Sequence, residues 1–134
     1  MIPSNNAILT TELTIETQPS KDYKLHAEQG IISGLTDNLE AMKQAVYKIL
    51  NTERYQHPIY SWNYGIELQD LFGMPVSYVC PELQRRIEEA LLQDDRIIAV
   101  TDFEFDTTTR RTVKVKFTVQ TIFGDIQNER AVTY

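Results

Sequence analysis

Apolar residues recur at intervals of three and four between positions 37 and 52, which is the spacing of an amphipathic helix. These residues are Leu39, Met42, Val46 and Ile49. Asp37 is suited to the N-cap, and Glu40 stands three residues later, as in a capping box. We therefore expect a helix over about residues 38–52, with Pro58 beyond its end.

A second helical pattern lies around Pro81, and its apolar positions are four residues apart. They are Val79, Leu83, Ile87 and Leu91. Pro81 suits the first turn of a helix and Glu82 suits the positive end of the helix dipole. We expect a helix over about 81–93, with residues 76–80 as an extra turn or a kinked continuation. The expected solvated face carries Arg85, Arg86, Glu88 and Glu89.

Two weaker patterns complete the first half of the chain. Residues 66–72 indicate a short helix that Gly73 and Pro75 end. Residues 23–27 and 31–32 are short strand candidates, separated at Gly30.

The last third of the chain alternates in the manner of β-strands. One face carries Val113, Val115, Phe117 and Val119, and lysines and threonine occupy the other face. An earlier alternation starts at Phe103 and Phe105. Gly124-Asp125 is a candidate two-residue hairpin turn. The final segment, residues 126–134, is polar on both faces, which favours a sheet edge.

These elements predict an α+β fold in which two to three helices pack on a small, mostly antiparallel sheet with a C-terminal β-hairpin. Residues 23–134 form the expected domain. Residues 1–22 are rich in Ser, Thr, Asn and Glu, and we expect them to form a flexible or extended arm.

Composition narrows the classes of function. The 134 residues carry a formal net charge of -6, so long-range attraction to nucleic-acid phosphates is disfavoured. A single cysteine, Cys80, fits a reducing compartment. No secretion signal follows Met1, and no apolar run approaches the roughly 20 residues of a membrane span.

Candidate chemistry is sparse. Two histidines and one cysteine stand at no recognisable zinc spacing, and there is no glycine-rich phosphate loop. Glu53, Glu67 and Asp70 are candidate paired carboxylates for glycoside hydrolysis. However, Glu53 lies beside Arg54, which favours the ionised form and not a proton donor. We predict no catalytic residue, no metal and no cofactor.

The connecting segment after the first helix combines an ion pair with many aromatic residues. Thr52-Glu53-Arg54 precedes Tyr55, Tyr60, Trp62 and Tyr64. Arginine suits a buried, hydrogen-bonded corner, and Arg and large aromatics also dominate protein interfaces. The segment is therefore a structural lock, an interface, or both.

These residues carry a resemblance to a known family. "GLTDNLEAMKQAVYKILNTERYQHPIYSWNYGIELQDLFG", "PELQRRIEEALLQDDRI" and "VTDFEFD" resemble the small baseplate wedge proteins of contractile phage tails, also called sheath initiators, including the XkdS-like proteins of defective Bacillus prophages. The resemblance covers about residues 23–134. An older label for the family is "lysozyme-like", and the residue pattern gives that label no support.

The family signature is a Glu-Pro-Arg-like triplet at a helix end, followed by a Tyr-Gly-(x)-(x)-Leu element. Here Thr52-Glu53-Arg54 stands at the triplet, and Tyr64, Gly65 and Leu68 match the second part. The middle proline is absent and Glu53 occupies its place, so Arg54 is the residue of the triplet that carries over directly.

The resemblance implies a structural protein of a phage or tailocin baseplate, assembled in the bacterial cytoplasm, with several copies in a ring. Its implied partners are baseplate wedge proteins and the tail sheath protein, with tail tube or hub proteins as further candidates, and no nucleic acid or membrane. The implied wedge-binding residues are Thr52, Glu53, Arg54, Tyr60, Trp62, Tyr64 and Gly65. The implied sheath-binding edge, which would accept sheath strands by β-augmentation, comprises Ile126, Asn128, Arg130 and Val132.

Two alternatives of other classes stay open at this point. One is a small regulatory adaptor of similar fold that binds a single soluble partner. The other is an acidic glycoside hydrolase, for which peptidoglycan hydrolysis at acidic pH is the direct assay.

Overall fold

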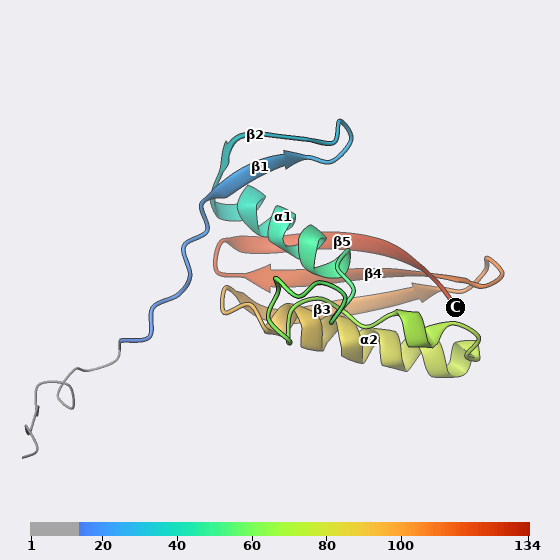
Figure 1. The fold of residues 1–134 in the computed structure, drawn as a ribbon. Helices are drawn as coiled ribbons and strands as arrows, with labels where there is room; N and C mark the ends of the chain where they lie inside the picture. Colours follow the sequence, from blue (N-terminus) through green and yellow to red (C-terminus); the bar gives the residue numbers. More distant parts are fainter. Residues whose placement is uncertain (1–13) are drawn as a thin grey trace, which may run out of the picture.

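The structure is a computed structural model that describes residues 14–134. The predicted α+β class is confirmed: two helices and two antiparallel sheets form the described part of the chain (Figure 1). In order, the elements are β1 (Asp22–His26), β2 (Ile31–Thr36), α1 (Asn38–Leu50), a short 3-10 helix (Gln69–Leu71), α2 (Val76–Leu92), β3 (Ile97–Asp106), β4 (Thr112–Thr121) and β5 (Gly124–Thr133).

The larger sheet has the strand order β3-β4-β5, and α1 and α2 cover one of its faces (Figure 1). The predicted alternation in β4 is confirmed, because every second residue is buried. These residues are Val113, Val115, Phe117 and Val119. They join the apolar residues of both helices in one core. The ring of Phe117 stacks on that of Phe103 in β3, with centroids 5.5 Å apart.

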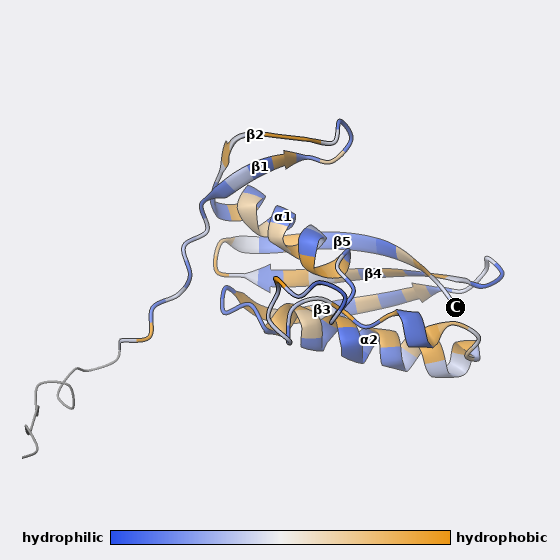
Figure 2. Ribbon diagram, viewed as in Figure 1, coloured by the Kyte–Doolittle hydropathy of each residue, from blue (hydrophilic) through white to orange (hydrophobic). Residues whose placement is uncertain are grey.

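The two edge strands of this sheet differ in regularity. The register of β5 with β4 runs without a shift over the whole length of the pair. The register of β3 with β4 shifts twice, between Ile97 and Ala99 and between Thr101 and Glu104. Asp102, inside the second irregularity, has a φ of 57°. β5 is also mostly hydrophilic (Figure 2), and its edge position confirms the prediction from its polar sequence.

The predicted first helix forms, with a shorter end. The Asp37 carboxylate accepts a hydrogen bond from Asn38 N (2.7 Å) and caps α1. Glu40 forms an ion pair with Lys43 (3.1 Å). The helix ends at Leu50, not at Thr52, and the Thr52 hydroxyl donates to the carbonyl of Lys48 (2.7 Å), which satisfies a terminal acceptor.

The second helix starts at Val76, so Pro81 lies inside it and not in its first turn. Of the two alternatives for residues 76–80, the structure shows continuation of the helix. Proline removes one backbone hydrogen bond from a helix interior. Burial of Val79 and of the apolar stripe that follows it stabilises the continuous helix. Cys80 packs against the core, and burial raises its thiol pKa.

Two local expectations were wrong. Residues 66–72 form only the 3-10 turn Gln69–Leu71. Ile66 is instead held in an extended bridge with Glu53 at the end of α1, so the segment cannot start a helix there. The β4–β5 turn lies at Ile122–Phe123, and Gly124, with a φ of 132°, already begins β5. The Thr121 hydroxyl accepts a hydrogen bond from Phe123 N (3.2 Å), which stabilises the turn at this earlier position.

The predicted N-terminal strands form the hairpin β1–β2, which lies on the side of α1 away from the larger sheet (Figure 1). Gln44 of α1 joins them: it accepts from Leu25 N (2.8 Å) and donates to Tyr23 O (2.6 Å). Residues 14–21 have no regular secondary structure, and residues 1–13 lie outside the described residues. The arm over residues 1–22 therefore stays a prediction.

A buried ion pair fixes the junction between α2 and β3. Arg96 Nη2 lies 2.7 Å from Asp94 Oδ2, and the two side chains are 11% and 8% exposed. Burial alone would raise the pKa of Asp94, but hydrogen bonds from the Arg96 side chain and backbone and the Arg96 charge hold it below its ordinary value. Arg96 also donates to the carbonyl of Pro19 (3.3 Å), which ties the N-terminal segment to this junction.

This pair predicts an acid-dependent loss of stability. The folded Asp94 has a lowered pKa, so its contribution is fully present above the unfolded pKa of about 3.9 and is lost as pH falls through the lower folded value. The wild-type thermal midpoint should therefore fall between about pH 5 and pH 2 more steeply than that of Asp94→Asn, which does not titrate. Parallel pH profiles of the two proteins would contradict this assignment.

Candidate functional site

A backbone bridge joins the end of α1 to the segment around residue 66. Ile66 N donates to Thr52 O (3.0 Å), and Arg54 N donates to Ile66 O (3.1 Å). Glu53 and Ile66 form an isolated parallel bridge in this way. The two halves of the sequence motif, Thr52-Glu53-Arg54 and Tyr64-Gly65, therefore lie side by side.

Gly65 is required at this bridge for two reasons. Its φ of 92° lies in the region that favours glycine. A Cβ on Gly65 would also lie 2.5 Å from Thr52 O and 3.2 Å from Arg54 N, both rigid backbone atoms. The bridge can form at this distance only because the side chain is absent.

Glu53 uses its carboxylate to stabilise the chain that follows the bridge. Its oxygens accept hydrogen bonds from Leu68 N (3.0 and 3.2 Å) and from Gln69 N (3.2 Å). These N–H groups open the 3-10 turn and have no partner within it. Glu53 thus acts as a cap, and its charge points into the domain.

Arg54 is the centre of this corner, with a side chain only 8% exposed. Its Nη1 donates to Glu89 Oε1 of α2 (2.9 Å) and lies 3.7 Å from Glu67 Oε1. Its Nη2 donates to Gly65 O (3.1 Å). These contacts link α1, the bridge and α2. Of the two earlier interpretations, the geometry supports a structural lock for Arg54 itself.

A second arginine on α2 was placed wrongly by the sequence analysis. Arg86 is buried, not solvated. It forms ion pairs with Asp70 and with Glu82 (3.1 Å), and it donates to Glu67 O (2.9 Å). A signal was available, because Arg86 stands three residues after Leu83 and four before Ala90 and so shares their buried face.

The ion pairs bear on the hydrolase alternative. A general acid needs a raised pKa, whereas the hydrogen bond from Arg86 lowers the pKa of Asp70. Glu53 caps backbone N–H groups, as described above. The arrangement of Glu53, Glu67 and Asp70 therefore supplies no observation in favour of glycoside hydrolysis.

Residues 55–64, here called the aromatic loop, project from the Arg54 corner. Tyr64 is partly buried against the core, burial raises its pKa, and Tyr60 stacks on it with ring centroids 4.6 Å apart. Trp62 is 75% exposed, and Tyr55 and Ile59 are also exposed. The structure thus divides the predicted wedge-binding set. Thr52, Glu53, Arg54 and Gly65 form the internal frame, while Tyr60 and Trp62 lie on the surface that the frame supports.

The outer edge of β5 is formed by alternate residues. Tyr134 N donates to Arg111 O (3.0 Å), and the register continues from this pair into the strands. Hydrogen-bonded and non-bonded pairs alternate along an antiparallel ladder. The residues of β5 that bond to β4 are therefore Ile126, Asn128, Arg130 and Val132. The N–H and C=O groups of Gln127, Glu129 and Ala131 point away from β4.

The predicted sheath-binding residues consequently lie on the inner side of the edge. Ile126 and Val132 are buried in the core, and Asn128 and Arg130 are half-buried. The exposed side chains of the strand, and its outward backbone groups, belong to the residues between them, including Gln127, Glu129 and Ala131.

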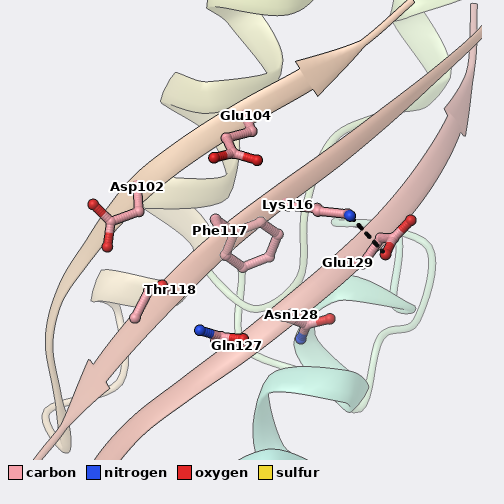
Figure 3. A pocket seen from close by; sticks show the side chains of 8 residues that line it. All are labelled: Asp102, Glu104, Lys116, Phe117, Thr118, Gln127, Asn128 and Glu129. Carbon is pink, nitrogen blue, oxygen red and sulfur yellow. Dashed lines mark ion pairs between the residues drawn. The ribbon is translucent and has the colours of Figure 1, made fainter.

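The face of the sheet opposite the helices is polar and open. A depression of about 410 Å³ crosses β3, β4 and β5 there (Figure 3). Lys116 points toward Glu129 across it (3.9 Å), and Asp102 and Glu104 line its β3 side. Within residues 14–134, no group of three or more His, Cys, Asp or Glu side chains could hold a metal ion. No helix in this range is long and apolar enough to cross a membrane.

Comparison with known proteins identifies the class. The family model of the contractile injection system sheath initiator matches residues 14–124, so the chain belongs to this family of contractile-tail proteins, and the resemblance noted from the sequence is confirmed. The chain is also 44% identical over 122 residues to the phage-like element PBSX protein XkdS of Bacillus subtilis (strain 168). That match covers 88% of this chain and 84% of the relative.

The close approach at Gly65 predicts a strong effect of a single methyl group. Gly65→Ala should lower the free energy of unfolding by roughly 2–4 kcal/mol, because it combines positive φ with a backbone clash. Gly73→Ala is the matched control: Gly73 also has positive φ (79°), but nothing lies within 4 Å of its Cβ position. It should cost about 1–2 kcal/mol. Urea denaturation measures both, and equal losses would contradict the role assigned to the bridge.

Proposed function

We propose that this sheath initiator starts sheath assembly by β-augmentation. An extended segment of the tail sheath protein pairs with the outer edge of β5, while the aromatic loop attaches the domain to the baseplate wedge. Several copies act together in a ring at the baseplate of a phage or tailocin particle assembled in the bacterial cytoplasm. Tail tube or hub proteins are further candidate neighbours.

The observation that carries this proposal is the regular outer edge of β5, which pairs with no other strand within residues 14–134. Its outward N–H and C=O groups at Gln127, Glu129 and Ala131 match the backbone of an added strand. About four or five such hydrogen bonds, at roughly 0.5–1.5 kcal/mol each, give only a few kcal/mol. A single edge therefore binds weakly, and a ring of edges gains affinity through multivalency.

Charged side chains protect this edge before assembly. Asp125 and Glu129 are exposed on β5, and charges on an edge strand are a common device against unwanted pairing. Because both are acidic, they repel the same edge of another copy at close range.

The aromatic loop supports the wedge attachment. Trp62, Tyr55 and Ile59 are large, exposed and close in sequence, and aromatic side chains often supply the dominant energy of protein interfaces. The Arg54 corner holds the base of the loop, so less conformational freedom is lost on binding. In this proposal Arg54 contributes to wedge binding indirectly, because it holds the loop in position.

Ala131→Pro tests the edge. Proline removes an outward N–H and leaves the bonds to β4 in place, so the domain should keep its thermal midpoint within a few degrees and lose sheath nucleation. Ala131→Ser, which keeps the N–H, is the control. Nucleation is measured as sheath formed on purified baseplates, seen by electron microscopy. Normal sheaths with folded Ala131→Pro protein would rule out pairing at this edge.

Trp62→Ala tests the loop. The variant should remain folded, because the side chain is 75% exposed, and its affinity for wedge proteins should fall by about tenfold or more, as for an interface hot spot. Tyr23→Ala is the control, since Tyr23 is also exposed and lies on β1. Pull-down with baseplate wedge proteins from the same contractile particle is the measurement. Equal retention of both variants would exclude the loop as the attachment surface.

A further inference from the structure

A pocket opens beside the β5 edge, between this strand and the last turn of α1. Its volume is about 310 Å³. Tyr47 and Asn51 line it from the side of α1, and Glu129, Arg130 and Ala131 line it from β5. It is distinct from the depression on the open face of the sheet, because Arg130 points to the inner face.

Arg130 brings a positive charge into this pocket without a counter-ion. Its Nε is buried and has no hydrogen-bond partner, and no carboxylate within residues 14–134 forms an ion pair with it. The Nε of Arg54 also lacks a hydrogen-bond partner, but Arg54, Arg86 and Arg96 each contact at least one carboxylate. A half-buried guanidinium without such a partner is unfavourable in the isolated domain.

Glu53 is the carboxylate whose charge acts on Arg130, but it does not form the missing ion pair. Burial lowers the pKa of Arg130, and the charge of Glu53 partly opposes this effect. The Glu53 carboxylate, however, is already bonded to Leu68 N and Gln69 N. Arg130 remains charged at neutral pH and is available to a carboxylate from outside.

The pocket lies beside the β5 edge, which indicates that the carboxylate belongs to a strand paired with this edge. Glu129 and Ala131 line the pocket, and their backbone groups form the outward edge described above. A strand paired to this edge would place every second side chain on the inner face. Directly opposite residues have Cβ atoms about 4.5–5.5 Å apart, so one of these side chains would lie beside Arg130.

We propose that the pocket receives the carboxylate of an Asp or Glu side chain from the extended sheath segment that adds to β5. This inference rests on the proposed function and deepens it, because backbone pairing alone is nearly independent of sequence, whereas a pocket for an alternate side chain selects the partner and its register. The Arg130 guanidinium donates charge-assisted hydrogen bonds to the carboxylate, and its planar fork suits a two-oxygen acceptor.

The first experiment compares Arg130→Met with the wild type in the nucleation assay, using the sheath protein of the same contractile particle. The concentration of folded initiator required for half-maximal nucleation should rise by about tenfold or more, which is the effect of losing one charge-assisted hydrogen bond. The thermal midpoint should stay the same or rise, because an uncompensated charge is removed. Arg130→Lys should recover part of the activity.

A second experiment identifies the partner residue. Each Asp and Glu in the extended terminal segments of the sheath protein is replaced by Asn or Gln. One replacement should reproduce the loss seen with Arg130→Met, and the double variant should be no worse than either single variant. A sheath variant with Arg at that position should restore nucleation by Arg130→Glu.

The outcomes separate the two proposals. If Ala131→Pro nucleates normally, the edge itself is wrong and the pocket proposal falls with it. If Ala131→Pro fails while Arg130→Met nucleates like the wild type, the edge stands and the pocket proposal is overturned. A thermal midpoint several degrees lower in Arg130→Met, with unchanged nucleation per folded molecule, overturns it too, because Arg130 is then structural.

Discussion

The contact between the backbone of residues 52–54 and Gly65 is the constraint on which the remaining structure depends. Two hydrogen bonds hold the chain at the end of α1 against Ile66, at a distance that admits no Cβ on Gly65. This contact closes the base of the aromatic loop, aims Glu53 at the N–H groups of the 3-10 turn and places Arg54 between the bridge and Glu89 of α2. The polar residues of the motif therefore have an internal role, and the surface that they support carries the large exposed side chains.

The sequence predicted the periodic elements well and the aperiodic ones poorly. The alternation in β4 and the stripe from Val79 to Leu91 each reflect burial on one face, and burial of one face is what a local pattern can report. The hairpin turn was predicted at Gly124-Asp125 but lies at Ile122–Phe123. Gly124 has a positive φ just after the turn, and the Thr121 hydroxyl stabilises the turn by accepting from Phe123 N. Arg86 was placed on the solvated face because of its charge, although its helical spacing from Leu83 indicated burial; its partner Asp70 lies on another segment.

The sequence indicated the segment of the candidate site but not which of its residues face inward. Arg54 and the aromatic residues stand close together along the chain, and no local pattern shows which of them face inward. The acids that hold Arg54, Glu67 and Glu89, come from two other segments. Likewise, the outward edge of β5 depends on which residues bond to β4, and that register is fixed by pairing across the hairpin. Such long-range choices are set by the tertiary structure, so single positions give no signal for them.

The two edge strands of the larger sheet differ in how well they could accept an added strand. β5 pairs with β4 in unbroken register, whereas β3 is bent by two irregularities, one of them at Asp102 with its positive φ. Bulges of this kind hinder the docking of another strand. In the proposed ring, this difference would oppose pairing of β3 of one copy with β5 of the next into an endless sheet. Under the proposed function, a nucleus of such copies would stay finite in its own plane, and further growth would proceed from the β5 side with other subunits.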